Sequence, residues 1–126
     1  MSNSPSVAVL LAAYNGMEWI EEQVSSILSQ KSISIEIFIS VDLSNDKTHE
    51  WCQGLAGKNA HVKVLPYGEK FGGAAKNFFR LIRDVDFSCF DYVALSDQDD
   101  IWDSSKLHHA IRTIEQDSLD GYSSDV

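Results

Sequence analysis

The sequence predicts an α/β domain in which a Rossmann-like parallel sheet is flanked by helices. Three observations lead to this expectation. Short apolar runs alternate with amphipathic stretches, the first run is apolar at nearly every position, and polar residues follow where several of the runs end. Strands buried on both faces read as continuous apolar runs, and strands alternating with helices imply right-handed crossovers in a parallel sheet.

The first half of the chain supplies two strands and one long helix. Val7 to Ala12 is the first expected strand, and Tyr14-Asn15-Gly16 breaks it. Apolar residues at helical spacing, together with acidic residues near the start, predict a helix from Glu18 to Gln30. Alternating isoleucines then predict a strand from Ile33 to Val41, which ends at Asp42.

The second half continues the alternation. We expect a short helix at Thr48 to Leu55, a strand at Val62 to Leu65, a helix opened by Gly72 and Gly73, a strand at Phe90 to Leu95, and a last helix with an apolar stripe at Leu107, Ala110, Ile111 and Ile114. In the helix after Gly73, the spacing predicts an apolar stripe of Phe78, Leu81, Ile82 and Val85, with Arg80, Arg83 and Asp84 facing water.

Composition limits the class of protein. The 126 residues predict one domain over 1–126, with frayed tails at 1–5 and 118–126. The net charge of −9 argues against general nucleic-acid binding. Cys52 and Cys89 lack metal-type spacing and are expected to be buried free thiols. No signal peptide or spanning apolar run is present, so we expect a cytoplasmic location, at most peripheral to the inner membrane face through further sequence.

An acidic cluster follows the fourth expected strand and has two interpretations. Asp97, Gln98, Asp99 and Asp100 offer only oxygen ligands, which suit Mg²⁺ or Mn²⁺ better than zinc. The alternative is a solvated acidic turn, with Asp103 as the cap of the next helix. Trp102, just beyond the cluster, is either a packing residue or a platform for a sugar ring.

The polar breaks after the first, second and fourth strands all fall at carboxyl ends. Because these ends share one edge of a parallel sheet, where ligands bind, the three segments are expected to converge on one rim. The chain has no GxGxxG after the first strand and no GxxxxGK[ST], which removes the usual signals for dinucleotide binding and nucleotide triphosphate hydrolysis. The histidines show no zinc pattern.

Four segments, in order, resemble the amino-terminal half of glycosyltransferase family 2, and most closely its rhamnosyltransferase-like bacterial members. They read "LLAAYNG", "SVDLSNDKT", "FGGAAKNFF" and "YVALSDQDDIW". The resemblance implies a truncated GT-A fold and an inverting transfer of sugar from a UDP- or dTDP-linked donor to an acceptor hydroxyl in cell-surface polysaccharide synthesis. It also implies Mg²⁺ or Mn²⁺ as cofactor, with a glycan or glycolipid as acceptor.

The resemblance also assigns residues. Ala13 and Tyr14 would lie against the nucleobase, Asp42 would accept a hydrogen bond from a pyrimidine, and Asp97 and Asp99 would form the DxD motif, with Asp97 toward the ribose and Asp99 on the metal. The full expected set for the donor is Ala13, Tyr14, Asn15, Asp42, Ser44, Lys76, Asp97 and Gln98, and the metal ligands are Asp97 and Asp99. The alternative role for Asn15 is that of a turn residue, and the alternative for Lys76 is that of a solvated helix residue.

Two departures from the family pattern affect these expectations. Val41-Asp42-Leu43-Ser44 lacks one acidic residue and a turn glycine, and the catalytic base is expected beyond Val126, so the chain alone is expected to be inactive. The alternatives are a phosphoacceptor receiver-like Mg²⁺-binding signalling domain and a non-catalytic nucleotide-sugar binding module. A receiver needs an acidic pair after its first strand, and a haloacid-dehalogenase-like phosphatase needs its DxD motif there; Leu11-Ala12-Ala13-Tyr14 supplies neither.

Overall fold

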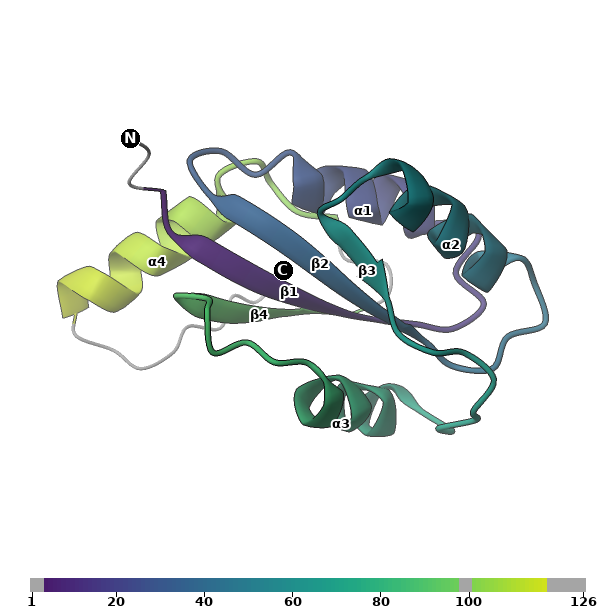
Figure 1. Ribbon diagram of the computed structural model, residues 1–126. Coiled ribbons are helices and arrows are strands. Elements are labelled where there is room, and N and C mark those ends of the chain that lie inside the picture. The colour runs from purple at the N-terminus through teal and green to yellow at the C-terminus, as the bar shows by residue number, and fades with distance from the viewer. Residues whose placement is uncertain (1–3, 98–100, 118–126) are drawn as a thin grey trace.

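The computed structural model describes residues 4–97 and 101–117. Four strands and four helices alternate within these ranges (Figure 1). Their bounds are β1 Ser6–Ala13, α1 Ile20–Leu28, β2 Ser34–Val41, α2 Thr48–Lys58, β3 Val62–Val64, α3 Ala74–Asp84, β4 Tyr92–Ser96 and α4 Lys106–Asp117. Both the α/β class and the order of elements predicted from the sequence are confirmed.

The sheet is parallel throughout, in the order β3-β2-β1-β4. Leu10 of β1 pairs with Phe38 of β2 on one side and with Leu95 of β4 on the other. The central position of β1 explains its sequence, because every residue from Val7 to Ala13 is buried. All four carboxyl ends therefore face the same edge of the sheet.

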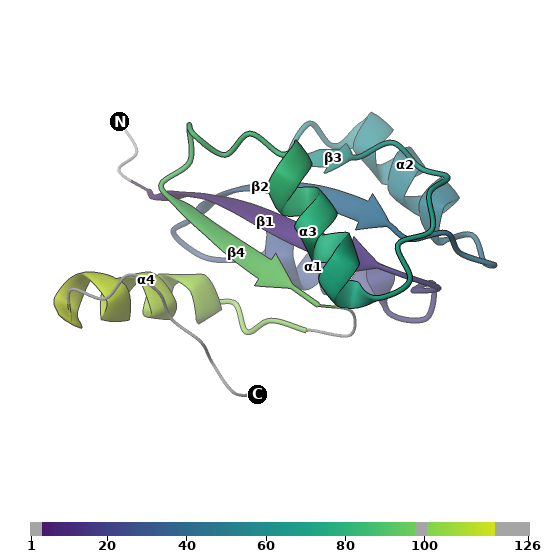
Figure 2. The ribbon, with the colours of Figure 1, turned by 90° about the horizontal axis from the view of Figure 1, so that it is seen from below.

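Helices cover the sheet unequally. One core cluster joins alternate residues of β1 and β2 to α1, α2 and α4, while a smaller cluster joins Leu10 and Ala12 of β1 to Leu81 and Val85 near the end of α3. In Figure 1, α3 lies on the side of the sheet opposite α1 and α2, and in Figure 2 it crosses in front of the strands with β4 beside it. Within the described ranges, no helix has both the length and the apolar character needed to cross a membrane.

The buried face of α3 differs from the predicted one. Arg80, expected in water, is 8% exposed, whereas Ile82, expected in the core, is 47% exposed. The helix is rotated so that Asn77 and Arg80 lie on the buried side beside Leu81, because both polar side chains find partners on the sheet.

Other expectations had mixed outcomes. The prediction for Cys52 is confirmed, but Cys89 is exposed, since it lies in the turn before β4 and not within a strand or helix. Trp102 is 5% exposed and belongs to the larger core cluster, which favours the packing interpretation. Asp103 lies three residues before the first residue of α4 and not directly at its start, and its Oδ1 accepts from the Ser105 N–H at 2.9 Å in the turn that leads into the helix. The expectation of frayed tails falls mostly on 1–3 and 118–126, outside the described residues.

Candidate functional site

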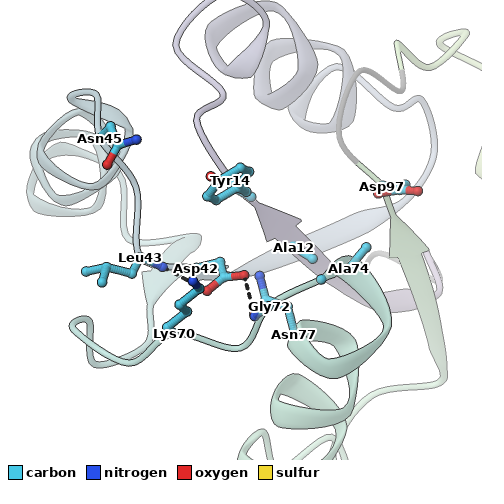
Figure 3. A pocket seen from close by; sticks show the side chains of 12 residues that line it. Ala12, Tyr14, Asp42, Leu43, Asn45, Lys70, Gly72, Ala74, Asn77 and Asp97 are labelled. Atoms are coloured by element: carbon cyan, nitrogen blue, oxygen red, sulfur yellow. Dashed lines mark hydrogen bonds between the residues drawn. The ribbon is translucent and has the colours of Figure 1, made fainter.

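A cavity of about 600 Å³ lies at the carboxyl edge of the sheet (Figure 3). Its lining comes from the ends of three strands and the start of α3: Ala12, Ala13, Tyr14, Asp42, Leu43, Asn45, Lys70, Gly72, Gly73, Ala74, Asn77 and Asp97. The predicted convergence of the three strand ends is therefore confirmed for Tyr14, Asp42 and Asp97, while the rest of the acidic cluster lies outside the described residues. Figure 3 shows Asp97 at the tip of β4, across the cavity from Asp42.

Asp42 is the most constrained carboxylate in the cavity, with an exposed fraction of 4%. Its Oδ1 accepts hydrogen bonds from the backbone N–H of Leu43 at 2.9 Å and of Phe71 at 2.7 Å, and its Oδ2 accepts from Gly72 N–H at 3.1 Å. A carboxylate offers about four acceptor positions, so roughly one remains on Oδ2. Asp42 thus joins the end of β2 to the loop before α3 and keeps acceptor capacity at the cavity wall.

The loop before α3 depends on two glycines. Gly72 has a φ of 82° and Gly73 a φ of 155°, both in the region that side-chain-bearing residues rarely adopt. A Cβ at either position would meet nothing within 4 Å, so the backbone conformation, and not crowding, requires glycine. Gly73 directly precedes α3, and this fits the expected role of the pair in starting the helix.

Asn15 and Ser44 do not line the cavity; they join the two loops above it. Asn15 N–H donates to Ser44 Oγ at 3.0 Å, and Asn45 N–H donates to Asn15 Oδ1 at 2.7 Å. Tyr67 supports the same loop, since its hydroxyl accepts from Ser44 N–H at 2.9 Å while its ring stacks on His49 at 4.0 Å. Asn15 has a φ of 45°, as expected of a turn residue. The contacts of Asn15 and Ser44 with a donor remain predictions.

Two side chains of α3 hold the end of β2. Neither role was expected from the sequence. Asn77 Nδ2 donates to the Ser40 carbonyl, and Arg80 Nη1 donates to Ser40 Oγ, both at 2.9 Å. Arg80 Nη2 also donates to the Pro66 carbonyl at 2.7 Å, and its guanidinium lies 5.2 Å from the ring centroid of Phe71. The strand is thereby fixed two residues before Asp42.

The remaining predicted residues are placed as follows. Lys76 is exposed in the first turn of α3 and is not among the cavity residues, whereas Lys70 is. Gln98, Asp99 and Asp100 lie outside the described residues, so the assignments of Gln98 and Asp99 stay predictions. Within residues 4–97 and 101–117, no three His, Cys, Asp or Glu side chains are grouped to hold a metal. Of the two expected metal ligands, only Asp97 is described, and it lines the cavity.

Known proteins resemble this chain in sequence and in fold. The pattern of glycosyl transferase family 2 matches residues 8–125. The dTDP-rhamnosyl transferase RfbG of Shigella flexneri is 48% identical over 117 residues, which are 92% of this chain and 40% of RfbG.

Solved glycosyltransferases support the same assignment of fold. TarS 1-349 of S. aureus in complex with UDP-GlcNAc superimposes with a TM-score of 0.71 at 19% identity, over 96% of this chain and 37% of that one. The mannosyltransferase PcManGT of Pyrobaculum calidifontis, solved with GDP-Man and Mn²⁺, gives a TM-score of 0.71 at 22% identity, over 87% of this chain and 32% of its own. The chain thus spans less than half the length of these relatives. With the family pattern covering nearly its whole length, the chain belongs to glycosyltransferase family 2.

Proposed function

We propose that this chain is the donor-binding part of an inverting glycosyltransferase that takes sugar from a UDP- or dTDP-linked donor. The observation that carries the proposal is the cavity that Asp42 and Asp97 share at the carboxyl edge of the sheet. The high identity to a protein named as a dTDP-rhamnosyl transferase supports a pyrimidine donor. The acceptor is proposed to be a hydroxyl of a cell-surface glycan or glycolipid, as the family resemblance implies.

The base is proposed to lie between the backbone of Ala13, the ring of Tyr14 and the loop that contains Gly72 and Gly73, which we call the glycine loop. Tyr14 is 50% exposed and lines the cavity, so its ring offers a face to a planar heterocycle. The remaining acceptor position of Asp42 Oδ2 would take the N–H of the pyrimidine. A purine presents a different edge and a larger volume, so this contact would favour uracil or thymine.

Asp97 is proposed to lie toward the ribose, with Gln98 beside it and Lys76 near the donor. Asp97 and Asp99 together would hold Mg²⁺ or Mn²⁺, since carboxylate oxygens suit these ions. When bound, such an ion neutralises the charge that develops on the departing diphosphate. A cation is needed there because the chain carries a net charge of −9 and offers the cavity only Lys70 as a basic lining residue among those described.

Calorimetry on the chain tests the proposal. UDP, dTDP and ADP are titrated into the wild type, Asp42→Asn and Asp99→Ala, each with and without Mn²⁺. The wild type should prefer the pyrimidine diphosphates and need Mn²⁺ for full affinity. Asp42→Asn should weaken pyrimidine binding by about 1–3 kcal/mol, the cost of an impaired buried hydrogen bond. Asp99→Ala should abolish the Mn²⁺ effect.

Asp86→Asn serves as the matched control, because Asp86 is an exposed aspartate that does not line the cavity. It should bind all three nucleotides as the wild type does. Equal affinity for ADP and UDP, or pyrimidine binding that Mn²⁺ does not change, would contradict the proposal.

A further inference from the structure

Three polar side chains of α1 and the turn after it contact the segments on either side of residues 98–100. Gln23 and Ser26 lie in α1, three residues apart and so on one side of the helix. Gln30 follows two residues after the end of α1. Gln23 is 0% exposed and Gln30 is 7% exposed, so the amides are buried between α1 and those segments. We call these three residues the α1 polar stripe.

On the amino-terminal side of residues 98–100, Gln23 holds the end of β4. Its Nε2 donates to Ser96 Oγ at 2.9 Å and to the Asp97 carbonyl at 2.5 Å. These bonds fix the backbone of the residue whose side chain lines the cavity across from Asp42.

On the carboxyl-terminal side, the other two members hold the approach to α4. Ser26 Oγ accepts from Trp102 N–H at 3.0 Å. Gln30 spans the next turn, because its Nε2 donates to the Asp103 carbonyl at 2.6 Å and its Oε1 accepts from Leu107 N–H at 2.9 Å. Both flanks of the acidic cluster are therefore attached to the same rigid element.

Stability alone does not explain the stripe. Gln23 occupies a position among the buried apolar residues Ile20, Val24 and Ile27, where the face of an amphipathic helix normally carries an apolar side chain. Its Oε1 is buried and has no partner among the described residues, and leaving such an acceptor unsatisfied is costly. The presence of a buried amide at this cost indicates that the position of the strand end held by Gln23 Nε2 is important for function.

We propose that the α1 polar stripe is a positioning device that sets Asp97 against the cavity and fixes the chain again at Trp102 and Asp103, with Gln23 as its principal residue. The inference rests on the proposed function, in which Asp97 faces the donor nucleotide. The base-binding wall is formed by Tyr14, Asp42 and the glycine loop. None of the hydrogen bonds described for Gln23 goes to this wall. The loss of Gln23 is therefore expected to weaken the contacts of Asp97 with the ribose and the metal and to leave recognition of the base unchanged.

The test compares Gln23→Met, which keeps the volume and removes the donor, with the wild type. Affinity is measured for UDP, dTDP and ADP in Mn²⁺, and the melting temperature is recorded. Gln23→Met should weaken the pyrimidine diphosphates about tenfold or more and leave their preference over ADP within about twofold of wild type. Gln53→Met, the same change on the exposed face of α2, should alter neither the affinities nor the preference. Affinity for UDP and dTDP that stays at the wild-type level, or a lost preference for them over ADP, would overturn the inference.

A readout without ligand separates this inference from the proposed function. Amide hydrogen exchange should become faster at Trp102 in Ser26→Ala and at Leu107 in Gln30→Met, since each N–H loses its acceptor. Both variants should also weaken diphosphate binding, so they test the inference if Gln23→Met fails to fold. A wild type that binds no nucleotide contradicts the proposed function, whereas normal wild-type binding with unchanged exchange and unchanged binding in the variants contradicts the stripe alone.

Discussion

Arg80 is predicted to contribute more to stability than any exposed cation of α3. Replacing it with methionine keeps most of its length but removes the donors to Ser40 Oγ and to the Pro66 carbonyl. Leaving the buried Ser40 Oγ without its donor costs about 1–3 kcal/mol, and the partly buried hydrogen bond to the Pro66 carbonyl contributes about 0.5–1.5 kcal/mol, so Arg80→Met is predicted to lose about 1.5–4.5 kcal/mol. The lost stacking on Phe71 acts in the same direction. This is a large fraction of the about 5–15 kcal/mol that stabilises a typical domain.

Urea unfolding followed by tryptophan fluorescence measures the change, with Arg83→Met as the matched control. Arg83 lies on the same helix and shares the partner Asp84 with Arg80, but its side chain is 67% exposed and, among the described residues, it donates to that carboxylate alone. Exposed ion pairs contribute about 0–1 kcal/mol, so the control should lose little. If the two variants differ by less than about 0.5 kcal/mol, the inferred role of the buried guanidinium is refuted.

Two further predictions concern titratable groups. Burial, followed by the charge of Asp46, raises the pKa of the Cys52 thiol to about 12, so thiol reagents at pH 8 should label the exposed Cys89 alone in the native chain and both cysteines in urea; two rapidly labelled native thiols would contradict this. The hydrogen bond from Arg83, assisted by Arg80, lowers the pKa of Asp84 from 3.8 to about 2. Its stabilising contribution is therefore complete above about pH 4 and lost as the pH falls toward about 2. In Asp84→Asn the midpoint of urea unfolding should depend less on pH in that window than in the wild type. Parallel plots of midpoint against pH for the two proteins would exclude the effect.

The fold was predictable because burial on both faces leaves a clear pattern in the sequence. β1 is a run of apolar residues since helices cover both of its sides, and the breaks after Ala13 and Val41 mark where the strands reach the edge of the sheet. Element bounds were less accurate. The first helix spans Ile20–Leu28 within the predicted Glu18 to Gln30, because end residues take conformations that local propensity does not determine.

The cavity was predictable in outline and not in its supporting contacts. Parallel strands bring their carboxyl ends together whatever the loops contain, so Tyr14, Asp42 and Asp97 could be grouped from the order of elements alone. The roles of Arg80 and Asn77 could not be predicted, because their partner Ser40 lies about forty residues earlier in the chain. Gln23 did leave a signal that the sequence analysis missed, namely a polar residue on the apolar face of an amphipathic helix.

The cavity is held from both faces of the sheet by the same kind of contact. On one face, α3 fixes Ser40 two residues before Asp42; on the other, α1 fixes Ser96 one residue before Asp97. In each case a buried amide binds a residue near the carboxyl end of a strand that is still paired with β1. The two carboxylates therefore keep their separation across the cavity through contacts from helices on both faces of the sheet. It follows that a change in Gln23, which is not among the residues lining the cavity, should alter nucleotide binding through the position of Asp97.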